Sequence, residues 1–139
     1  MLRLRRGKKG IELQLHELEA AIMEVVWSRQ WSEFSVGDVL EVLEKKRDIA
    51  YTTVMTTVSR LYDKEILTRQ RDGKRYLYCP RMNRQEFLES TARQVLDGLG
   101  PAGEQHAVAL LVEKVSAASR KELDEIEALI KKRRKELGA

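Results

Sequence analysis

Apolar residues recur along this chain at the three- and four-residue intervals of amphipathic helices, and the pattern becomes strand-like once, near the middle. The helical spacing predicts helices at about 17–27, 36–46, 51–64, 83–97, 104–115 and 119–137. Start signals stand at three of the predicted N-termini: Ser35 with Asp38, Asn83, and Ser119 with Glu122. Residues 98–103, which include three glycines and a proline, are expected to break the chain between the fourth and fifth helices.

Two β-prone runs, 66–71 and 74–79, flank the dipeptide Asp72-Gly73. Asp-Gly between such runs predicts a hairpin whose two turn residues both have positive φ. Residues 33–35 are expected to form a short extended segment. Three helices followed by a hairpin are the outline of a winged helix-turn-helix, so we expect a mostly α fold with a small β wing and a C-terminal helical region.

The third predicted helix has an unusual polar side. Its apolar stripe consists of Tyr51, Val54, Val58 and Leu61, and its facing stripe of Thr52, Thr53, Thr56 and Arg60. Threonines are poor helix formers, so they indicate a role other than helix stability. Short hydroxyls and methyls suit close approach to base edges and phosphates, and arginine can fork onto guanine. A polar face without a function is the alternative that the helix alone leaves open.

The first two helices are expected to supply much of the remaining core. The residues expected to be buried are Leu18, Ile22, Val25 and Val26 in the first helix and Val39, Leu40 and Leu43 in the second. Glu17, Glu19 and Glu24 are expected to point outward. Trp27 and Trp31 flank an apolar helix end, which favours packing over base stacking.

Charge is distributed unevenly along the chain. Residues 1–10 carry five basic and no acidic side chains, residues 11–50 four against nine, residues 51–82 seven against three, and residues 83–139 ten against ten. The positive regions are therefore the N-terminal tail, the threonine-rich helix and the hairpin, which suits a polyanionic partner. The hairpin cations expected to contact phosphates are Arg69, Arg71, Lys74 and Arg75.

The charge pattern and the helix pattern together predict three regions. Residues 1–10 are expected to be a disordered basic arm, either a tail without function or one that brings Arg3, Arg5 and Arg6 to DNA. Residues 11–82 are the expected winged-helix domain. Residues 83–139 are too few for a core of their own, so we expect dimerisation through Leu88, Val95, Val108, Leu111, Val112, Leu123, Ile126 and Ile130.

The sequence argues against several other classes of protein. Cys79 is the single cysteine, so no internal disulfide is expected, and neither His16 nor His106 has metal-ligand spacing. No nucleophile elbow, phosphate loop or dinucleotide fingerprint is found, so neither enzyme activity nor a cofactor is expected. No apolar run approaches the roughly 20 residues that span a bilayer, and we expect a cytoplasmic protein.

The chain resembles the penicillinase repressor family of bacterial winged-helix regulators over residues 15–137. The most specific resemblance is in residues 51–61, followed by 64–67 and by the wing residues 76–78, and residues 19–27 are similar to the family's first helix. The resemblance implies a homodimer that binds palindromic promoter DNA, with the third helix in the major groove and dimerisation through C-terminal helices. Thr52, Thr53 and Thr56 match DNA-facing positions of the family, and Arg60 matches a family arginine.

Some positions depart from the family's pattern. Met55 stands where staphylococcal members have arginine, which implies a different operator sequence. Those members are inactivated by proteolysis at an Asn-Phe bond through a membrane sensor metallopeptidase, and here the corresponding pair is Leu110-Leu111. Copper-responsive members carry C-terminal Cys-x-Cys motifs, which this chain lacks.

These observations predict a homodimeric, sequence-specific transcriptional repressor that binds a palindromic operator in double-stranded promoter DNA. Bases would be read by Tyr51, Thr52, Thr53, Met55, Thr56 and Arg60. An inducing event, proteolytic or other, would act by loosening the C-terminal dimer. The alternative is a winged-helix module that docks a protein partner without reading DNA.

Overall fold

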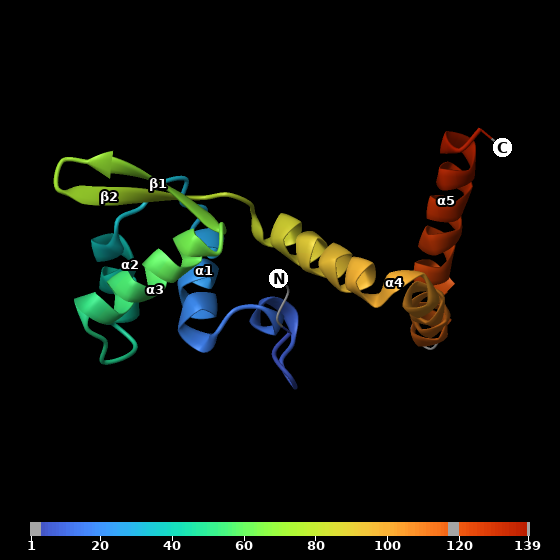
Figure 1. Cartoon of the computed structure of the whole chain (residues 1–139), viewed down its shortest axis with the longest axis horizontal. Helices are drawn as coiled ribbons and strands as arrows, with labels where there is room; N and C mark the ends of the chain where they lie inside the picture. Colours follow the sequence, from blue (N-terminus) through green and yellow to red (C-terminus); the bar gives the residue numbers. More distant parts are fainter. Residues whose placement is uncertain (1–3, 117–119, 139) are drawn as a thin grey trace. The chain divides into compact units, whose positions relative to one another are not determined.

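The computed structural model describes residues 4–116 and 120–138, whose elements are shown in Figure 1. They are η1 (Gly10–Leu13), α1 (Glu17–Ser28), α2 (Val36–Leu43), α3 (Tyr51–Asp63), β1 (Leu67–Asp72), β2 (Arg75–Pro80), α4 (Arg84–Ser116) and α5 (Arg120–Glu136). The chain divides into two compact units, Met1–Arg93 and Gln94–Ala139, each described by itself below. The expected fold, mostly helical with a small β wing, is confirmed.

The core of the first unit lies between its three long helices and the hairpin. Its most completely buried side chains are Leu15, Ile22, Met23, Val26, Phe34, Val39, Val54, Val58, Leu61 and Leu67. Burying one such side chain is favourable by about 1.5–3 kcal/mol. Because α3 buries Val54, Val58 and Leu61, its opposite side must remain outside.

The hairpin is confirmed, but its turn lies one residue later than predicted. The strands pair antiparallel from Leu67 opposite Pro80 to Asp72 opposite Arg75, so the two turn residues are Gly73 and Lys74. Only Gly73 has positive φ, at 63°, as in hairpin turns that place glycine first. The prediction that Asp72 occupies a turn position with positive φ is wrong, because Asp72 ends β1.

The extended segment before α2 is also confirmed, and one of its residues pairs with the outer edge of β2 in the wing. Phe34 forms an antiparallel bridge with Tyr78, in which Phe34 N–H donates to Tyr78 O at 2.9 Å and Tyr78 N–H donates to Phe34 O at 2.8 Å. The capping box of α2 is confirmed too, with Asp38 N–H donating to Ser35 Oγ at 3.2 Å and Ser35 N–H to Asp38 Oδ2 at 2.8 Å.

The chain reverses sharply between α3 and β1. Glu65 has φ of 64°, in the left-handed region, and Ile66 N–H donates to Leu61 O at 3.0 Å. These are features of a helix C-terminus closed by a left-handed residue. The hairpin therefore begins a few residues after the last turn of α3.

The first turns of α4 are fastened to α1 by the segment that leaves the hairpin. The indole N–H of Trp27 donates to Met82 O at 2.9 Å, and the Trp27 and Phe87 rings have centroids 5.5 Å apart. Asn83 caps α4 as predicted, since Glu86 N–H donates to Asn83 Oδ1 at 2.8 Å.

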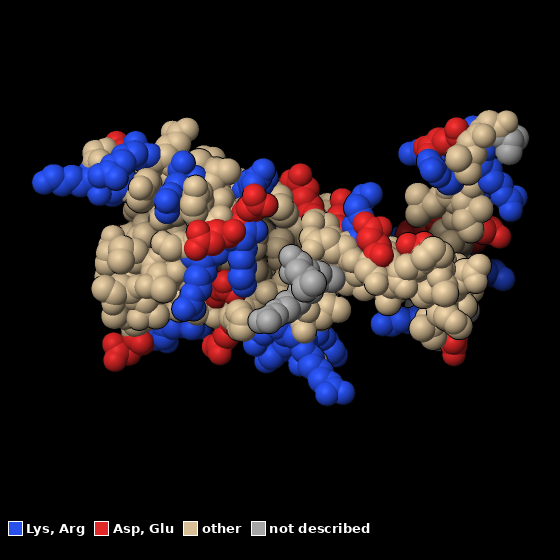
Figure 2. Space-filling model, in the orientation of Figure 1, with Lys and Arg blue, Asp and Glu red and all other residues tan. Residues whose placement is uncertain are grey.

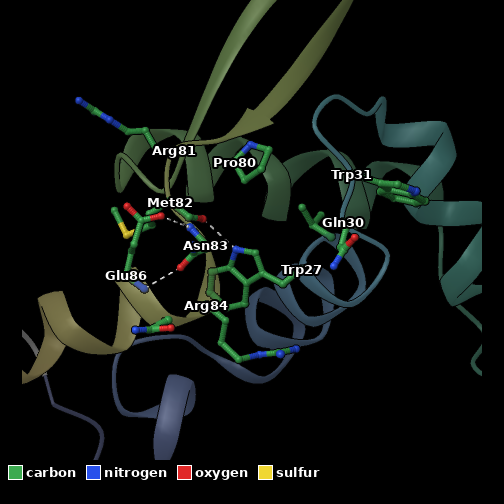
Figure 3. Close-up of a pocket in the computed structure, with 11 residues that line it drawn as sticks. Trp27, Gln30, Trp31, Pro80, Arg81, Met82, Asn83, Arg84 and Glu86 are labelled. Atoms are coloured by element: carbon green, nitrogen blue, oxygen red, sulfur yellow. Dashed lines mark hydrogen bonds between the residues drawn. The ribbon is translucent and has the colours of Figure 1, made fainter.

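Figure 3 shows the surface pocket at this junction, with Trp27 at its centre and Trp31 at its edge. Both tryptophans therefore pack, as expected.

Arg5, from the predicted N-terminal arm, forms hydrogen bonds with residues that follow η1 or end it. Arg5 N–H donates to Leu13 O at 2.8 Å, and the Arg5 guanidinium donates to Leu15 O at 2.7 Å. Ile11 in η1 is buried in the core. Arg3, the first cation of the predicted arm, lies outside the described residues.

Glu19 is the clearest error in the predicted surface. It is only 3% exposed, and its Oε1 accepts hydrogen bonds from His16 N–H at 2.9 Å and from Lys64 Nζ at 2.8 Å. Glu19 shares a helix face with Ile22, Met23 and Val26, which are buried. The ion pair ties the start of α1 to the residue that follows α3.

The second unit contains little besides helix. Gly100, with φ of 72° and ψ of 175°, is the non-helical residue inside α4 and is followed by Pro101, so the predicted break is confirmed as a kink. No residue of α5 is buried. Ser119, the predicted cap of the last helix, lies outside the described residues. Within residues 4–116 and 120–138 no helix is both long and apolar enough to cross a bilayer.

Candidate nucleic-acid interface

The polar side of α3 is fully presented to solvent. All six residues predicted to read bases are exposed: Tyr51, Thr52, Thr53, Met55, Thr56 and Arg60. Tyr51, which the apolar pattern also placed on the buried stripe, is 49% exposed. The residues that the sequence assigns to the outer side of this helix are therefore exposed.

The hydroxyls on α3 are partly engaged by the helix itself. Thr56 Oγ1 donates to Thr52 O at 2.9 Å, and Thr57 Oγ1 donates to Thr53 O at 2.8 Å. Thr57 is buried, so this bond satisfies a core hydroxyl. In the exposed Thr56 the hydroxyl hydrogen is used, which leaves only oxygen lone pairs and a methyl group for an external partner.

Three of the four predicted hairpin cations lie at or next to the turn. Arg71 Nε donates to Gly73 O at 3.2 Å, and the exposed Arg75 and Asp72 side chains form an ion pair at 3.4 Å. No hydrogen bond or ion pair within the described residues involves Lys74. Figure 2 shows Lys and Arg side chains gathered over the free end of the hairpin. The tip is thus a cationic surface on which the one ion pair among the described residues joins Arg75 to Asp72.

Arg69 contacts two aromatic rings, whereas Arg71 lies 5.5 Å from one of them, that of Tyr76. The Arg69 guanidinium carbon lies 3.9 Å from the ring centroid of Tyr62 and 4.2 Å from that of Tyr76. Desolvation acts to lower the pKa of Arg69, but its interactions with Tyr78, Tyr76 and Tyr62 outweigh this effect and raise the pKa. The group therefore stays protonated.

The exposed side of α3 and the basic tip border one cleft. Its lining includes Tyr51 and Met55 from α3, and Lys74, Arg75 and Tyr76 from the wing. Tyr78 of β2 and Ser35, Val36 and Gly37 at the start of α2 complete it. The two surfaces that the sequence predicts separately are therefore neighbours in space.

Sequence reasoning missed the tyrosines and the start of α2 as parts of this region. Tyr62 and Tyr76 were not assigned a role, although the pairing of Arg71 with Tyr76 and of Arg69 with Tyr78 would have placed aromatic rings beside the arginines. That pairing depends on the hairpin register, which the predicted turn did not supply correctly. Within the described residues no cluster of His, Cys, Asp and Glu has the arrangement of a metal site.

A family profile and curated relatives point to one family. A family profile described as "Penicillinase repressor" matches residues 15–132. The chain is 37% identical over 123 residues to "Transcriptional regulator BlaI" of Mycobacterium tuberculosis, covering 83% of this chain and 86% of that protein. It is 23% identical over 124 residues to "Penicillinase repressor" of Staphylococcus aureus, covering 89% and 94%.

Among solved structures, the chain resembles the solution structure of the DNA-binding domain of the repressor BlaI. The sequence identity is 26% and the TM-score 0.45, and the match covers 50% of this chain and 83% of that one. A Staphylococcus aureus MepR–DNA complex matches with 13% identity and a TM-score of 0.43, covering 76% of this chain and 79% of that one.

Proposed function

Because the chain belongs to the penicillinase repressor family, we propose that it is a homodimeric transcriptional repressor that binds a palindromic operator in promoter DNA. The observation that carries the proposal is the exposed side of α3, which borders the same cleft as the basic end of the hairpin. An uncharged hydroxyl surface beside a cationic tip suits a helix in the major groove and a wing on the adjacent backbone.

On this proposal α3 reads base edges. Thr53 and Thr56 approach closely because their side chains are short, and Met55 and Tyr51 offer apolar contact to thymine methyls. Since the hydroxyl hydrogen of Thr56 is donated to Thr52 O, Thr56 is expected to accept from an adenine or cytosine amino group or to contact a thymine methyl. Arg60, at the other end of the exposed side, is expected to contact guanine or phosphate.

The hairpin tip would supply phosphate contacts. Lys74 needs to give up no internal bond, whereas Arg71 and Arg75 exchange weak exposed interactions for phosphate. An exposed ion pair such as Arg75 with Asp72 contributes at most about 1 kcal/mol, so it is readily replaced by a phosphate contact. Three cations per protomer are therefore available to the backbone.

Dimerisation is proposed from the exposed apolar residues of the second half of α4 and of α5. Half or more of the residue surface is exposed at Val108, Leu111, Val112, Leu129 and Leu137. Large exposed apolar side chains that gather in one patch typically mark an interaction site. A second copy would bury it and would present two α3 helices to a twofold-symmetric operator.

The charge pattern of α5 favours an antiparallel arrangement of this helix with its copy. Its first half carries Glu122, Asp124, Glu125 and Glu127, and its second half carries Lys131, Lys132, Arg133, Arg134 and Lys135. A parallel pair would place like charges opposite each other. An antiparallel pair centred near Ala128 would place acids opposite bases and Ile126 opposite the partner's Ile130.

Relief of repression would act on the same helices. Loss of the dimer separates two linked half-site contacts and so lowers operator affinity without touching α3. The pair Leu110-Leu111, aligned with the bond that a protease cuts in staphylococcal members, is exposed on α4. A protease, including a membrane sensor metallopeptidase pathway, is one event that would have this effect.

A salt titration of duplex binding tests the proposal. Three phosphate contacts per protomer predict that a dimer loses affinity with a log–log slope of about −5. Thr53→Ala and Thr56→Ala should lose specific binding to a site selected from random duplexes while keeping nonspecific binding. Duplex binding that is absent, or indifferent to salt, would support the rival function of a protein-interaction module.

A further inference from the structure

Arg69 lies on the inner face of the wing. Side chains alternate along a strand, and residues directly opposite each other in a ladder share a face. Arg69 therefore shares its face with Leu67 on β1 and with Tyr78 on β2, and both of these are nearly fully buried. Arg69 is half-buried where this face packs against the helical core, whereas Arg71, further along the same face, is exposed next to the turn.

The Arg69 guanidinium is in contact with two aromatic rings from different elements. Tyr62 lies in the last turn of α3, and Tyr76 lies in β2. The distances from the guanidinium carbon to the two ring centroids, 3.9 and 4.2 Å, are well inside the roughly 6 Å range of cation–π contacts. A planar guanidinium can stack on rings in this way, whereas an ammonium group lacks the flat surface.

This contact is a second attachment between α3 and the wing. The covalent connection runs through residues 64–66 and fixes where β1 begins. The free end of the hairpin, with Arg71, Lys74 and Arg75, lies further along the strands, and its direction depends on how the inner face is held. Arg69 of β1 contacts both the last turn of α3 and β2.

We propose that Arg69 is a positioning residue, stacked between Tyr62 and Tyr76, that sets the angle of the wing relative to α3 and does not bind phosphate. This inference rests on the proposed function, because the angle affects affinity only if α3 and the hairpin tip bind one duplex. Removal of Arg69 would misplace the tip cations without removing any of them.

Salt dependence separates positioning from phosphate binding. Arg69→Met should weaken duplex binding by about 3- to 30-fold while leaving the log–log salt slope unchanged. Lys74→Met removes the same charge from the tip and should reduce the slope by about 0.9 per lost contact. Arg69→Lys keeps the charge but not the planar stack, and should bind more weakly than wild type with an unchanged slope.

The opposite pattern would overturn the proposal. If Arg69→Met lowers the salt slope as much as Lys74→Met does, and Arg69→Lys restores both slope and affinity, Arg69 is a phosphate ligand. Thermal unfolding of each variant establishes that it is folded before binding is compared.

Two measurements on the full chain without DNA test the stack independently of the proposed function. Amide exchange at β2 should become faster in Arg69→Met and stay unchanged in Lys74→Met. The effects of Arg69→Met and Tyr62→Leu on that exchange should be non-additive, whereas those of Lys74→Met and Tyr62→Leu should add. Unchanged amide exchange at β2 in Arg69→Met would show that Arg69 does not hold the wing in place. If the wild-type protein bound no duplex, the proposed repressor function would be wrong, whatever the result for Arg69.

Discussion

The two units of this chain are built from similar amphipathic helices but differ in what those helices bury. In the first unit Val54, Val58 and Leu61 of α3 are completely buried against neighbouring elements. In the second unit no residue of α5 is buried, and Leu111 of α4 is 56% exposed. The same apolar spacing therefore gives a closed core in one unit and an exposed apolar face among the described residues of the other.

This difference shows what helical periodicity does and does not specify. A period of three to four residues states that one side of a helix is apolar. It does not state whether the surface that covers this side belongs to the same chain. In the first unit the partner surfaces are supplied within about 80 residues, and in the second we propose that another copy supplies them.

The largest expected effect comes from a charge on the exposed apolar face. Leu111→Glu should dissociate the proposed dimer and weaken operator binding by about 100- to 10,000-fold, because the second half-site contact loses its effective concentration. His106→Glu is a matched control, since it adds the same charge on the opposite side of the same exposed helix. Sedimentation and duplex binding of both variants check the result. Equal sedimentation of the two variants would contradict a dimer interface at Leu111.

Truncating a leucine to alanine should destabilise the first unit much more than the second. Leu61→Ala removes a fully buried side chain and should lower the free energy of unfolding by about 2–5 kcal/mol. Leu110→Ala removes one that is 63% exposed and lies away from the Leu111 stripe, and should change it by less than about 0.5 kcal/mol. Denaturant unfolding measures both. A large effect at Leu110 would mean that its surface is covered in solution.

An equivalent contrast exists for ion pairs. Glu19→Gln removes the charge from a carboxylate that is almost fully buried and bonded to Lys64, and should destabilise the first unit by about 1–3 kcal/mol. Glu136→Gln breaks the exposed pair with Arg133 in α5 and should cost less than about 1 kcal/mol. Thermal unfolding of the two variants under one buffer condition gives the comparison. Equal shifts would show that the Glu19 pair is as dispensable as a surface pair.

Much of the first unit could be predicted because its local signals agree with its packing. The apolar positions of α1 and α3, the Ser35–Asp38 capping box and the existence of the hairpin all followed from spacing and residue type. Glu19 could not be predicted by a rule that places carboxylates outside, because its partner Lys64 is distant in sequence. The turn was misplaced by one residue because Asp72-Gly73 and Gly73-Lys74 both provide a glycine for positive φ.

The candidate site was predicted in its location more than in its contacts. The exposed side of α3 follows from its buried stripe, so residues such as Thr52 and Thr56 could be assigned to it from the sequence. The environment of Arg69 could not, because it depends on the hairpin register and on where Tyr62 and Tyr76 lie in space. Four hairpin cations look equivalent in a sequence, and only three lie at or next to the tip.

The smallest expected effect concerns the proposed antiparallel arrangement of α5. The double variant Lys131→Glu, Lys132→Glu places acids opposite acids in an antiparallel pair and should weaken the dimer by about 2- to 10-fold at low salt. A parallel pair predicts no weakening, since it exchanges one like-charge contact for another. The complementary variant Asp124→Lys, Glu125→Lys should weaken its own dimer similarly.

Mixing the two variants supplies the control for this prediction. In an antiparallel heterodimer every reversed charge again meets an opposite one, so sedimentation of the mixture should show dimers at the wild-type concentration dependence. High salt should reduce the difference in dimer stability between wild type and either double variant alone, because exposed charges are screened. Homodimers as stable as wild type at low salt would exclude the antiparallel arrangement while leaving dimerisation itself in place.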